Sequence, residues 1–365
     1  MNESHTKNLL EEAFSKVQEY NYLSYINLVK TYKRSFRDDY YQKHIANRVL
    51  EKFGLHLMYK STLDDLESQS YARMGKWSSV GMLLLALKNP DEFDEVYNLF
   101  LDEDSRVTFD WFIKYRVAYA FLGELASEIF PPKISRAEYL SKISDIKVNN
   151  GLIDVHGYQI RTGALEAAQA FLFEQYSLEG KCKVDIGDHV INGGAFEGET
   201  SFWFISKGAD KVYAFEPDQF NYSILVENIE RNRVSNRILP IKKILSNKIG
   251  TFSFCSAGVM SVVINEGKQT IQGITLDSFV EDKGLNRVDF LKLDVEGAEL
   301  EILEGAVETI KKFKPKMAIS VYHKPDDIVS IPKFILQLLP KAKFYLSHKC
   351  YTFSETVIFV NPRDN

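Results

Sequence analysis

The chain has 365 residues, of which 45% are hydrophobic and 26% are charged, so it resembles an ordinary globular protein long enough for two domains. Its net charge of −5 argues against a general nucleic-acid binder, which usually carries a basic excess. Cys182, Cys255 and Cys350 form no C-x-x-C pair, so we expect neither a disulfide framework nor a thiolate zinc site, and a cytoplasmic location. The polar N-terminus and the short apolar run from Val80 to Leu87 predict no signal peptide and no membrane span.

Residues 1–145 are predicted to form an all-helical N-terminal domain. Apolar residues recur there at helical spacing, first at Leu9, Leu10, Phe14 and Val17, and then at Val49, Phe53 and Leu57. Trp111, Tyr115 and Tyr119 share one helical stripe, which we expect to be buried core rather than a ligand platform. Helix breakers between Pro131 and Gly151 mark the boundary, so residues 146–365 are expected to form the second domain.

In the second domain, short apolar runs alternate with helical patterns, which is typical of a mainly parallel sheet with helices on both faces. The predicted strands cover residues 189–193, 211–215, 238–245, 288–293, 316–322, 343–346 and 356–360. The loop from Ser347 to Glu355 is too short for a crossover helix, so the last two strands must pair antiparallel.

The first of these strands runs into a turn of small residues, namely Gly193, Gly194, Ala195 and Gly198, and the next strand ends at Glu216. Such a turn lets a ligand approach the backbone, and an acid about twenty residues later is placed to accept ribose hydroxyls. The spacing G-G-x-x-x-G is not that of a dinucleotide site, and the acids within the turn would repel a pyrophosphate. The pattern favours S-adenosylmethionine, whose sulfonium is cationic. The alternative is an ordinary strand-to-helix turn.

A second segment, Val288 to Gly305, reads VDFLKLDVEGAELEILEG. A strand of buried type ends at Asp294, a turn carries Glu296 and Gly297, and an apolar helical face follows. Together with Ile274 to Asp277 and with Ser320 to Asp327, this segment resembles the FkbM family of S-adenosylmethionine-dependent methyltransferases. The resemblance covers about half the chain, roughly residues 184 to 360.

The resemblance implies a class I methyltransferase fold: an α/β, Rossmann-like sheet that is mainly parallel with one antiparallel strand, here preceded by the all-helical domain. It implies a cofactor site for S-adenosylmethionine made by Asn192, Gly193, Gly194, Ala195, Gly198 and Glu216. Asn192 departs from the family, which most often has Asp at this position. The resemblance also implies methylation of a hydroxyl, often of a sugar or glycan, or another small molecule. We expect the helical domain to pack beside the sheet rim and to shape the acceptor pocket or a homo-oligomer interface.

Methyl transfer to a hydroxyl requires alignment, exclusion of water and often a base. Asp294, Glu296 and His323 are the predicted catalytic residues, and we expect Asp294 or His323 to take the proton. His348 is a further candidate base, because it also lies near the end of a predicted strand. Each has a structural alternative, since the acids could cap a helix and His323 could bond to backbone in a turn. No metal ligand set is assigned. Asp294, Glu296 and Asp326 could supply oxygen ligands, but their spacing does not require a metal.

Two other classes of function remain open. A nucleotide-dependent oxidoreductase would need the G-x-G-x-x-G turn, which the sequence lacks. A noncatalytic interaction protein with a methyltransferase-like scaffold is the alternative that a weak cofactor site at Asn192 would favour.

Overall fold

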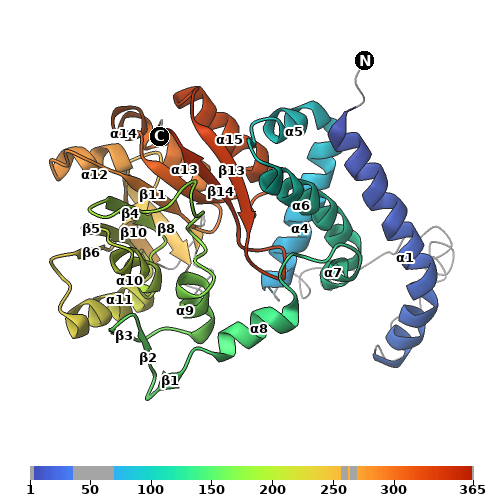
Figure 1. Ribbon diagram of the computed structural model, residues 1–365, viewed down its shortest axis with the longest axis horizontal. Helices are drawn as coiled ribbons and strands as arrows, with labels where there is room; N and C mark the ends of the chain where they lie inside the picture. Colours follow the sequence, from blue (N-terminus) through green and yellow to red (C-terminus); the bar gives the residue numbers. More distant parts are fainter. Residues whose placement is uncertain (1–3, 36–69, 256–261, 264–268, 364–365) are drawn as a thin grey trace.

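The computed structural model describes residues 4–35, 70–255, 262–263 and 269–363. Within them, a seven-stranded sheet lies at the centre of the C-terminal region (Figure 1) in the order β13-β14-β12-β11-β4-β5-β6. Its strands are β4 (His189–Gly193), β5 (Lys211–Phe215), β6 (Ile238–Ile241), β11 (Phe290–Leu293), β12 (Lys316–Ser320), β13 (Lys343–His348) and β14 (Thr356–Asn361). Strand β14 runs antiparallel to both of its neighbours, and the other pairings are parallel. The predicted fold class is therefore confirmed.

Both faces of this sheet are buried, because side chains alternate between two hydrophobic clusters with the period of two that a strand imposes. In β12, Met317 and Ile319 belong to one cluster and Ala318 belongs to the other. The cluster of Ala318 is covered by α9 (Ala164–Phe171), α10 (Glu199–Ser206) and α11 (Gln219–Asn232). The opposite cluster is covered by α12 (Leu276–Asp282), α13 (Glu299–Glu304), α14 (Val307–Phe313) and α15 (Asp327–Leu338).

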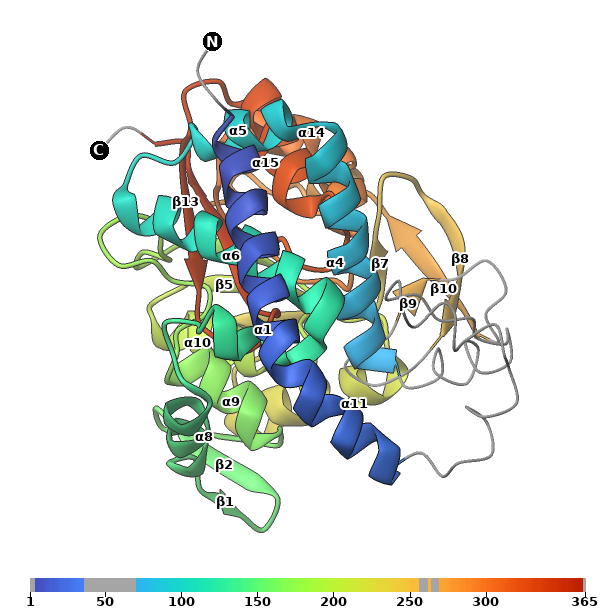
Figure 2. The same ribbon diagram turned by 90° about the vertical axis from the view of Figure 1, so that its right-hand side faces the viewer.

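The N-terminal helices are α1 (His5–Ser35), α4 (Ser70–Lys88), α5 (Pro90–Tyr97), α6 (Glu103–Leu122), a 3₁₀ turn (Gly123–Leu125), α7 (Ala126–Ile129) and α8 (Arg136–Ser144). The N-terminal helices up to α7 extend this second cluster, whereas Tyr139 of the last one, α8, belongs to a small third cluster. Helices α1 and α4 both pack on α6 (Figure 2). Helix α6 in turn covers the edge strand β13, where the Ser105 hydroxyl accepts a hydrogen bond of 2.9 Å from the Leu346 amide. The helices thus shield an otherwise exposed sheet edge.

The predicted aromatic stripe of α6 is confirmed as core at two of its three positions. Tyr115 and Tyr119 are buried, whereas Trp111 is partly buried and lies against the His348 ring, with 4.2 Å between ring centroids. The predicted helical positions Val49, Phe53 and Leu57 lie outside the described residues. The domain boundary at residues 145 and 146 stays a prediction.

Three segments differ from the sequence prediction. The predicted strand 238–245 is divided: after β6 the chain leaves the large sheet, and β7 (Ile244–Leu245) joins a smaller sheet of order β7-β10-β8-β9, with β8 (Gly250–Cys255), β9 (Val262–Val263) and β10 (Gln269–Ile274). The predicted helix after Gly297 breaks between α13 and α14 at Gly305, because the chain there presses against the Ser246 carbonyl and leaves no room for a side chain. The boundary zone contains helix α8, and from its end onward the chain forms a small sheet of β1 (Val148–Asn149), β2 (Leu152–Val155) and β3 (Tyr158–Ile160).

Candidate functional site

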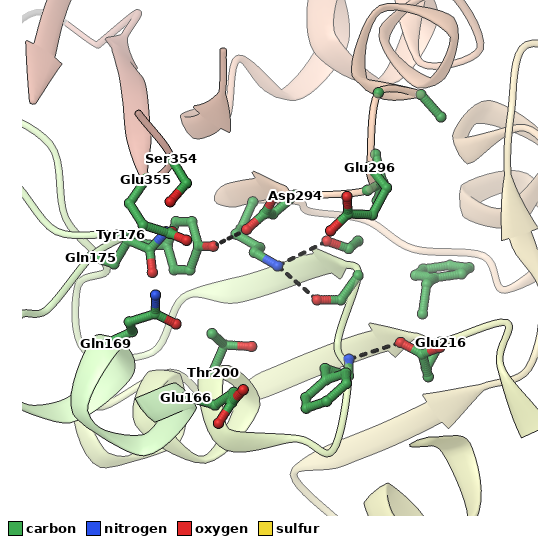
Figure 3. A pocket seen from close by; sticks show the side chains of 18 of the residues that line it. Glu166, Gln169, Gln175, Tyr176, Thr200, Glu216, Asp294, Glu296, Ser354 and Glu355 are labelled. Carbon is green, nitrogen blue, oxygen red and sulfur yellow. Dashed lines mark hydrogen bonds between the residues drawn. The ribbon is translucent and has the colours of Figure 1, made fainter. Parts of the chain in front are cut away.

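A cavity of about 1030 Å³ opens at the carboxyl ends of β4, β5 and β11. The strand order reverses between β4 and β11, and ligands of open α/β sheets bind where it reverses. The parallel pairing of β11 with β4 places Leu293 opposite Gly193, so the residues that follow each strand meet in the cavity. Figure 3 shows Asp294 between two sides of this cavity. We call them the Glu216 side (Phe215, Glu216 and Pro217) and the Glu355 side (Gln169, Gln175, Tyr176, Ser354 and Glu355).

The glycine turn brings backbone, without side chains, to the cavity wall. Gly193 and Gly194 line the cavity, and Gly194 has a positive φ of 74°. A side chain at Gly194 would overlap the Asp294 carbonyl oxygen, so only glycine lets the two strand ends approach this closely. Ala195 and Gly198 lie behind the wall; Gly198 takes a φ of 101° at the start of α10, against Leu225. The predicted turn therefore shapes the wall, but only its first two glycines face the cavity.

Asn192 does not face the cavity, contrary to its predicted contact with a cofactor. Its side chain is fully buried, and its amide nitrogen donates to the hydroxyls of Thr200 (3.0 Å) and Ser201 (2.9 Å) at the start of α10. The residue before a strand end points into one face of the sheet, and here that face is packed by α10. Asn192 therefore links the end of β4 to the first turn of α10 through hydrogen bonds.

Glu216 lies at the tip of β5, on the cavity wall, with only 5% of its surface exposed. Its carboxylate accepts hydrogen bonds of 2.8 Å from the backbone amides of Phe196 and Asp218, and the first of these is drawn in Figure 3. Burial raises the pKa of Glu216 to about 8, although the two amides oppose the change. The predicted strand-tip acid is thus in place and is held by the glycine turn itself.

Lys292 was not predicted as a site residue, yet it lines the cavity. Its ammonium donates to the carbonyl oxygens of Gly193 (3.1 Å) and Gly194 (2.7 Å), and it lies 4.9 Å from the centre of the Tyr176 ring. Burial lowers its pKa, while the surrounding carboxylates oppose the change. A charged residue within the apolar run FLKL was the available sequence signal, because a buried lysine is rare unless it is paired.

Asp294 accepts hydrogen bonds from two tyrosines that come from distant parts of the chain. The Tyr176 hydroxyl donates to Oδ2 at 2.5 Å, and the Tyr322 hydroxyl lies 3.4 Å from Oδ1. Burial alone would raise the pKa of Asp294, but the charges of Lys292 and His323 hold it below its usual range. The residue is therefore an anion that is fixed in orientation.

Glu296 and His323 adjoin Asp294 but differ in their access to the cavity. Glu296 lines it from a left-handed backbone conformation with a φ of 55°. Burial raises the pKa of Glu296 to about 7. His323 is buried behind the wall, with Nδ1 at 2.9 Å from Glu299 Oε1 and Nε2 at 3.5 Å from Asp294 Oδ1. Burial alone would lower the pKa of His323, but the carboxylates of Glu299, Asp294 and Glu296 raise it to about 10.

The other two predicted candidates lie away from the cavity. His348 is buried against Trp111, its Nδ1 lies 2.9 Å from the Thr356 hydroxyl, and burial lowers its pKa to about 3. It does not belong to the cavity wall, because the side chains of β13 alternate and this one faces α6. Asp326 occupies the N-cap position of α15, and its side chain makes no capping hydrogen bond there. Neither residue reaches the group around Asp294.

The Glu355 side is built from segments that the sequence analysis did not assign to the site. Gln175 donates to Glu355, whose pKa burial raises to about 8. Figure 3 shows Gln169, Tyr176 and Ser354 on the same side. Helix α8 adds Tyr139 and two apolar residues to the wall, so the N-terminal helical region does reach the cavity. Polar side chains from three segments that are distant in sequence thus meet on one side of Asp294.

No helix among the described residues is both long and apolar enough to cross a bilayer.

Comparisons with known proteins agree with this geometry. Residues 185–346 match the family described as Methyltransferase FkbM domain. The chain is 32% identical over 136 residues to the hexuronic acid methyltransferase AglP of Haloferax volcanii, covering 36% of this chain and 54% of that protein. It is 28% identical over 156 residues to the methyltransferase sdnD of Sordaria araneosa, covering 33% of this chain and 60% of that protein. The chain therefore spans only about half to three fifths of these curated relatives.

The crystal structure of methyltransferase FkbM from Methylobacillus flagellatus KT has a similar fold, with a TM-score of 0.52 and 19% identity. The similarity covers 75% of this chain and 59% of that one.

Proposed function

The chain belongs to the FkbM methyltransferase family through residues 185–346, and from this premise we propose that it is an S-adenosylmethionine-dependent O-methyltransferase. The observation that carries the proposal is the cavity at the reversal of strand order, where bare glycine backbone, Glu216 and Asp294 converge. Its wall contains several carboxylates, which suit a ligand with a positive centre and disfavour a pyrophosphate. Glu216 supports the cofactor assignment, since a strand-tip carboxylate can accept both ribose hydroxyls.

We propose a hydroxyl of a sugar or glycan as the acceptor. The hexuronic acid methyltransferase among the relatives supports a sugar. The Glu355 side supports it too, because amide, carboxylate and hydroxyl groups there (Gln169, Gln175, Ser354 and Glu355) match the hydrogen-bonding needs of a polyol. The acceptor would lie on this side of Asp294, opposite the cofactor ribose at Glu216.

In the proposed reaction the acceptor oxygen attacks the methyl carbon, the carbon–sulfur bond breaks with its electron pair remaining on sulfur, and the hydroxyl proton passes to a protein carboxylate. Glu296 suits this role best among the three predicted catalytic residues, because its carboxylate lines the cavity and accepts no hydrogen bond from any described residue. Asp294 already accepts from two tyrosines, and His323 lies behind the wall. Asp294 and His323 are then positioning residues.

Calorimetry tests the cofactor assignment directly. Wild-type protein should bind S-adenosylmethionine and its demethylated product but not NAD. Glu216→Ala removes the two hydrogen bonds proposed for the ribose hydroxyls and should weaken binding at least about tenfold. Glu230→Ala, an exposed acid on α11, is the matched control and should bind as the wild type does. Unchanged affinity in Glu216→Ala would refute the role of Glu216, and no heat with any of the three ligands would favour the noncatalytic alternative.

Turnover tests the acceptor and the base. The demethylated product should form with at least one sugar in a panel of neutral sugars, amino sugars and hexuronic acids. Glu296→Gln keeps the size of the side chain and should slow turnover about a hundredfold or more, with cofactor affinity unchanged. Near wild-type turnover in this variant would exclude Glu296 as the base, and Asp294→Asn would then be compared in the same assay.

A further inference from the structure

A group of ionisable side chains at and behind the cavity wall offers three candidate ligand atoms for a cation. Asp294, Glu299 and His323 each offer one such atom, and these atoms lie within 4.8 Å of one another. The residues come from three separate places: the end of β11, the start of α13, and the turn after β12. Asp294 and Glu299 are five residues apart in sequence, and the tertiary structure brings His323 to them.

These side chains are buried but incompletely satisfied. Glu299 has no exposed surface and His323 has 8%. Glu299 Oε2 and both ring nitrogens of His323 lack a hydrogen-bond partner of proper geometry among the described residues. Glu299 Oε1, by contrast, accepts from the Val295 amide at 2.9 Å, which fixes the orientation of the carboxylate. A buried polar atom without a partner is costly, and a bound ion is one of the few groups that would satisfy several at once.

We propose that Asp294, Glu299 and His323 hold a divalent metal ion. His323 would release a ring proton on binding the ion. One imidazole and two carboxylates are then a ligand set suited to Mn²⁺, Fe²⁺ or Zn²⁺, and the two negative charges would balance the charge of the ion. Metal–ligand bonds of roughly 2.1 Å require ligand atoms about 3 to 4 Å apart. The 3.5 Å between His323 Nε2 and Asp294 Oδ1 already fits, and the wider separations need a small contraction.

Access to such an ion would be from the cavity, because Asp294 is part of its wall. A coordination position on that side would face the place proposed for the acceptor. A metal ion lowers the pKa of an oxygen ligand, so it would make the acceptor hydroxyl easier to deprotonate. Glu296 lies outside the ligand set, 3.7 Å from His323 Nε2, and remains available to take the proton. This role rests on the proposed function, whereas metal binding itself does not.

Titration with Mn²⁺, followed by electron paramagnetic resonance and calorimetry on the full chain, tests the site. After removal of metals with a chelator, wild-type protein should bind one ion per chain. His323→Gln and Asp294→Asn should each weaken binding at least about tenfold. Glu301→Gln is the matched control, because Glu301 is another cavity carboxylate on α13 but stands outside the ligand set. It should bind Mn²⁺ as the wild type does.

Thermal melts establish that each variant is folded, and S-adenosylmethionine calorimetry without added metal establishes that the cofactor site is intact. The proposal is overturned if the wild type does not bind Mn²⁺ below about millimolar concentration. It is also overturned if both ligand variants bind normally, or if Glu301→Gln loses as much affinity as they do. Cofactor binding is measured separately from metal binding. A failure to bind Mn²⁺ therefore leaves the proposed methyltransferase function intact, and a failure to bind S-adenosylmethionine leaves the proposed metal site intact.

Discussion

The two sides of the cavity are assembled in different ways. The Glu216 side comes from one strand–helix–strand unit, in which the turn at Gly193 and Gly194 and the acid Glu216 are joined by a short stretch of chain. The Glu355 side is assembled from segments far apart, so that Tyr176 donates to Asp294 across 118 residues and Gln175 donates to Glu355 across 180. The first side is a local motif, and the second exists only once the whole domain has folded.

The helical region reinforces this contrast. Arg116 of α6 is buried, with 1% of its surface exposed, and donates to the Tyr322 carbonyl at 3.1 Å and to the Ser78 hydroxyl of α4. Gly81 of α4 presses against Pro325 so closely that a side chain there would displace the proline. Helices α4 and α6 therefore pack against the turn that carries Tyr322 and His323 and hold it in place. We expect damage to them to affect the acceptor half of the site more than the Glu216 side.

The largest effect is expected where the two strand ends touch. Gly194→Ala forces a side chain into the Asp294 carbonyl and also places alanine at a positive φ. The free energy of unfolding should fall by about 3 kcal/mol or more, and S-adenosylmethionine binding should be lost in calorimetry.

Gly180→Ala separates the two causes of this loss. Gly180 has a similar φ of 71°, but nothing lies within 4 Å of the position its side chain would take. Gly180→Ala should lower the free energy of unfolding by only about 1 kcal/mol, which is the cost of placing alanine at a positive φ. Equal losses in both variants, measured by chemical denaturation, would show that the close approach to Asp294 does not matter.

A smaller effect is expected from Arg116→Met, which removes the hydrogen bonds that the buried guanidinium donates to the Tyr322 carbonyl and the Ser78 hydroxyl. Stability should fall by about 3 kcal/mol, while the S-adenosylmethionine dissociation constant of the folded protein should change less than about threefold. Arg106→Met on the same helix removes a partly buried arginine that bonds to Phe100 and should cost about 1 kcal/mol. A large loss of cofactor affinity in Arg116→Met would contradict the separation of the two sides.

The smallest effect concerns pH and the Glu216 side. The folded protein holds the pKa of Glu216 at about 8, above its ordinary value of 4.5, so protonation favours the folded state. This contribution is present below pH 4.5 and is lost as the pH rises through 8. Glutamine does not titrate, so Glu216→Gln lacks this pH-dependent loss. The free energy of unfolding of the variant minus that of wild type should therefore be larger at pH 8.5 than at pH 5, by about 1 kcal/mol or more. Parallel denaturation curves at both pH values check this, and an unchanged difference would show that Glu216 is not desolvated.

Much of the fold could be predicted because its signals are local. Alternation of apolar strands and helices predicted the parallel sheet, and the short loop from Ser347 to Glu355 predicted the antiparallel strand β14. The errors lie where a distant partner overrides the local pattern. Ile244 leaves the large sheet to pair with Gly273, and the helix breaks at Gly305 because Ser246 lies against it. In both places the decisive contact involves a residue that is remote in sequence.

The glycine turn, Glu216, Asp294 and Glu296 were determined by the sequence itself, because a strand end, a turn and the next strand end follow one another along the chain and leave a readable spacing. Only the tertiary structure decided which of them face the cavity: it turned Asn192 toward α10 and buried His323 behind the wall. It also placed Lys292 against the glycine carbonyls. Burial and charge depend on every segment that packs around a side chain, and no short stretch of sequence contains that information.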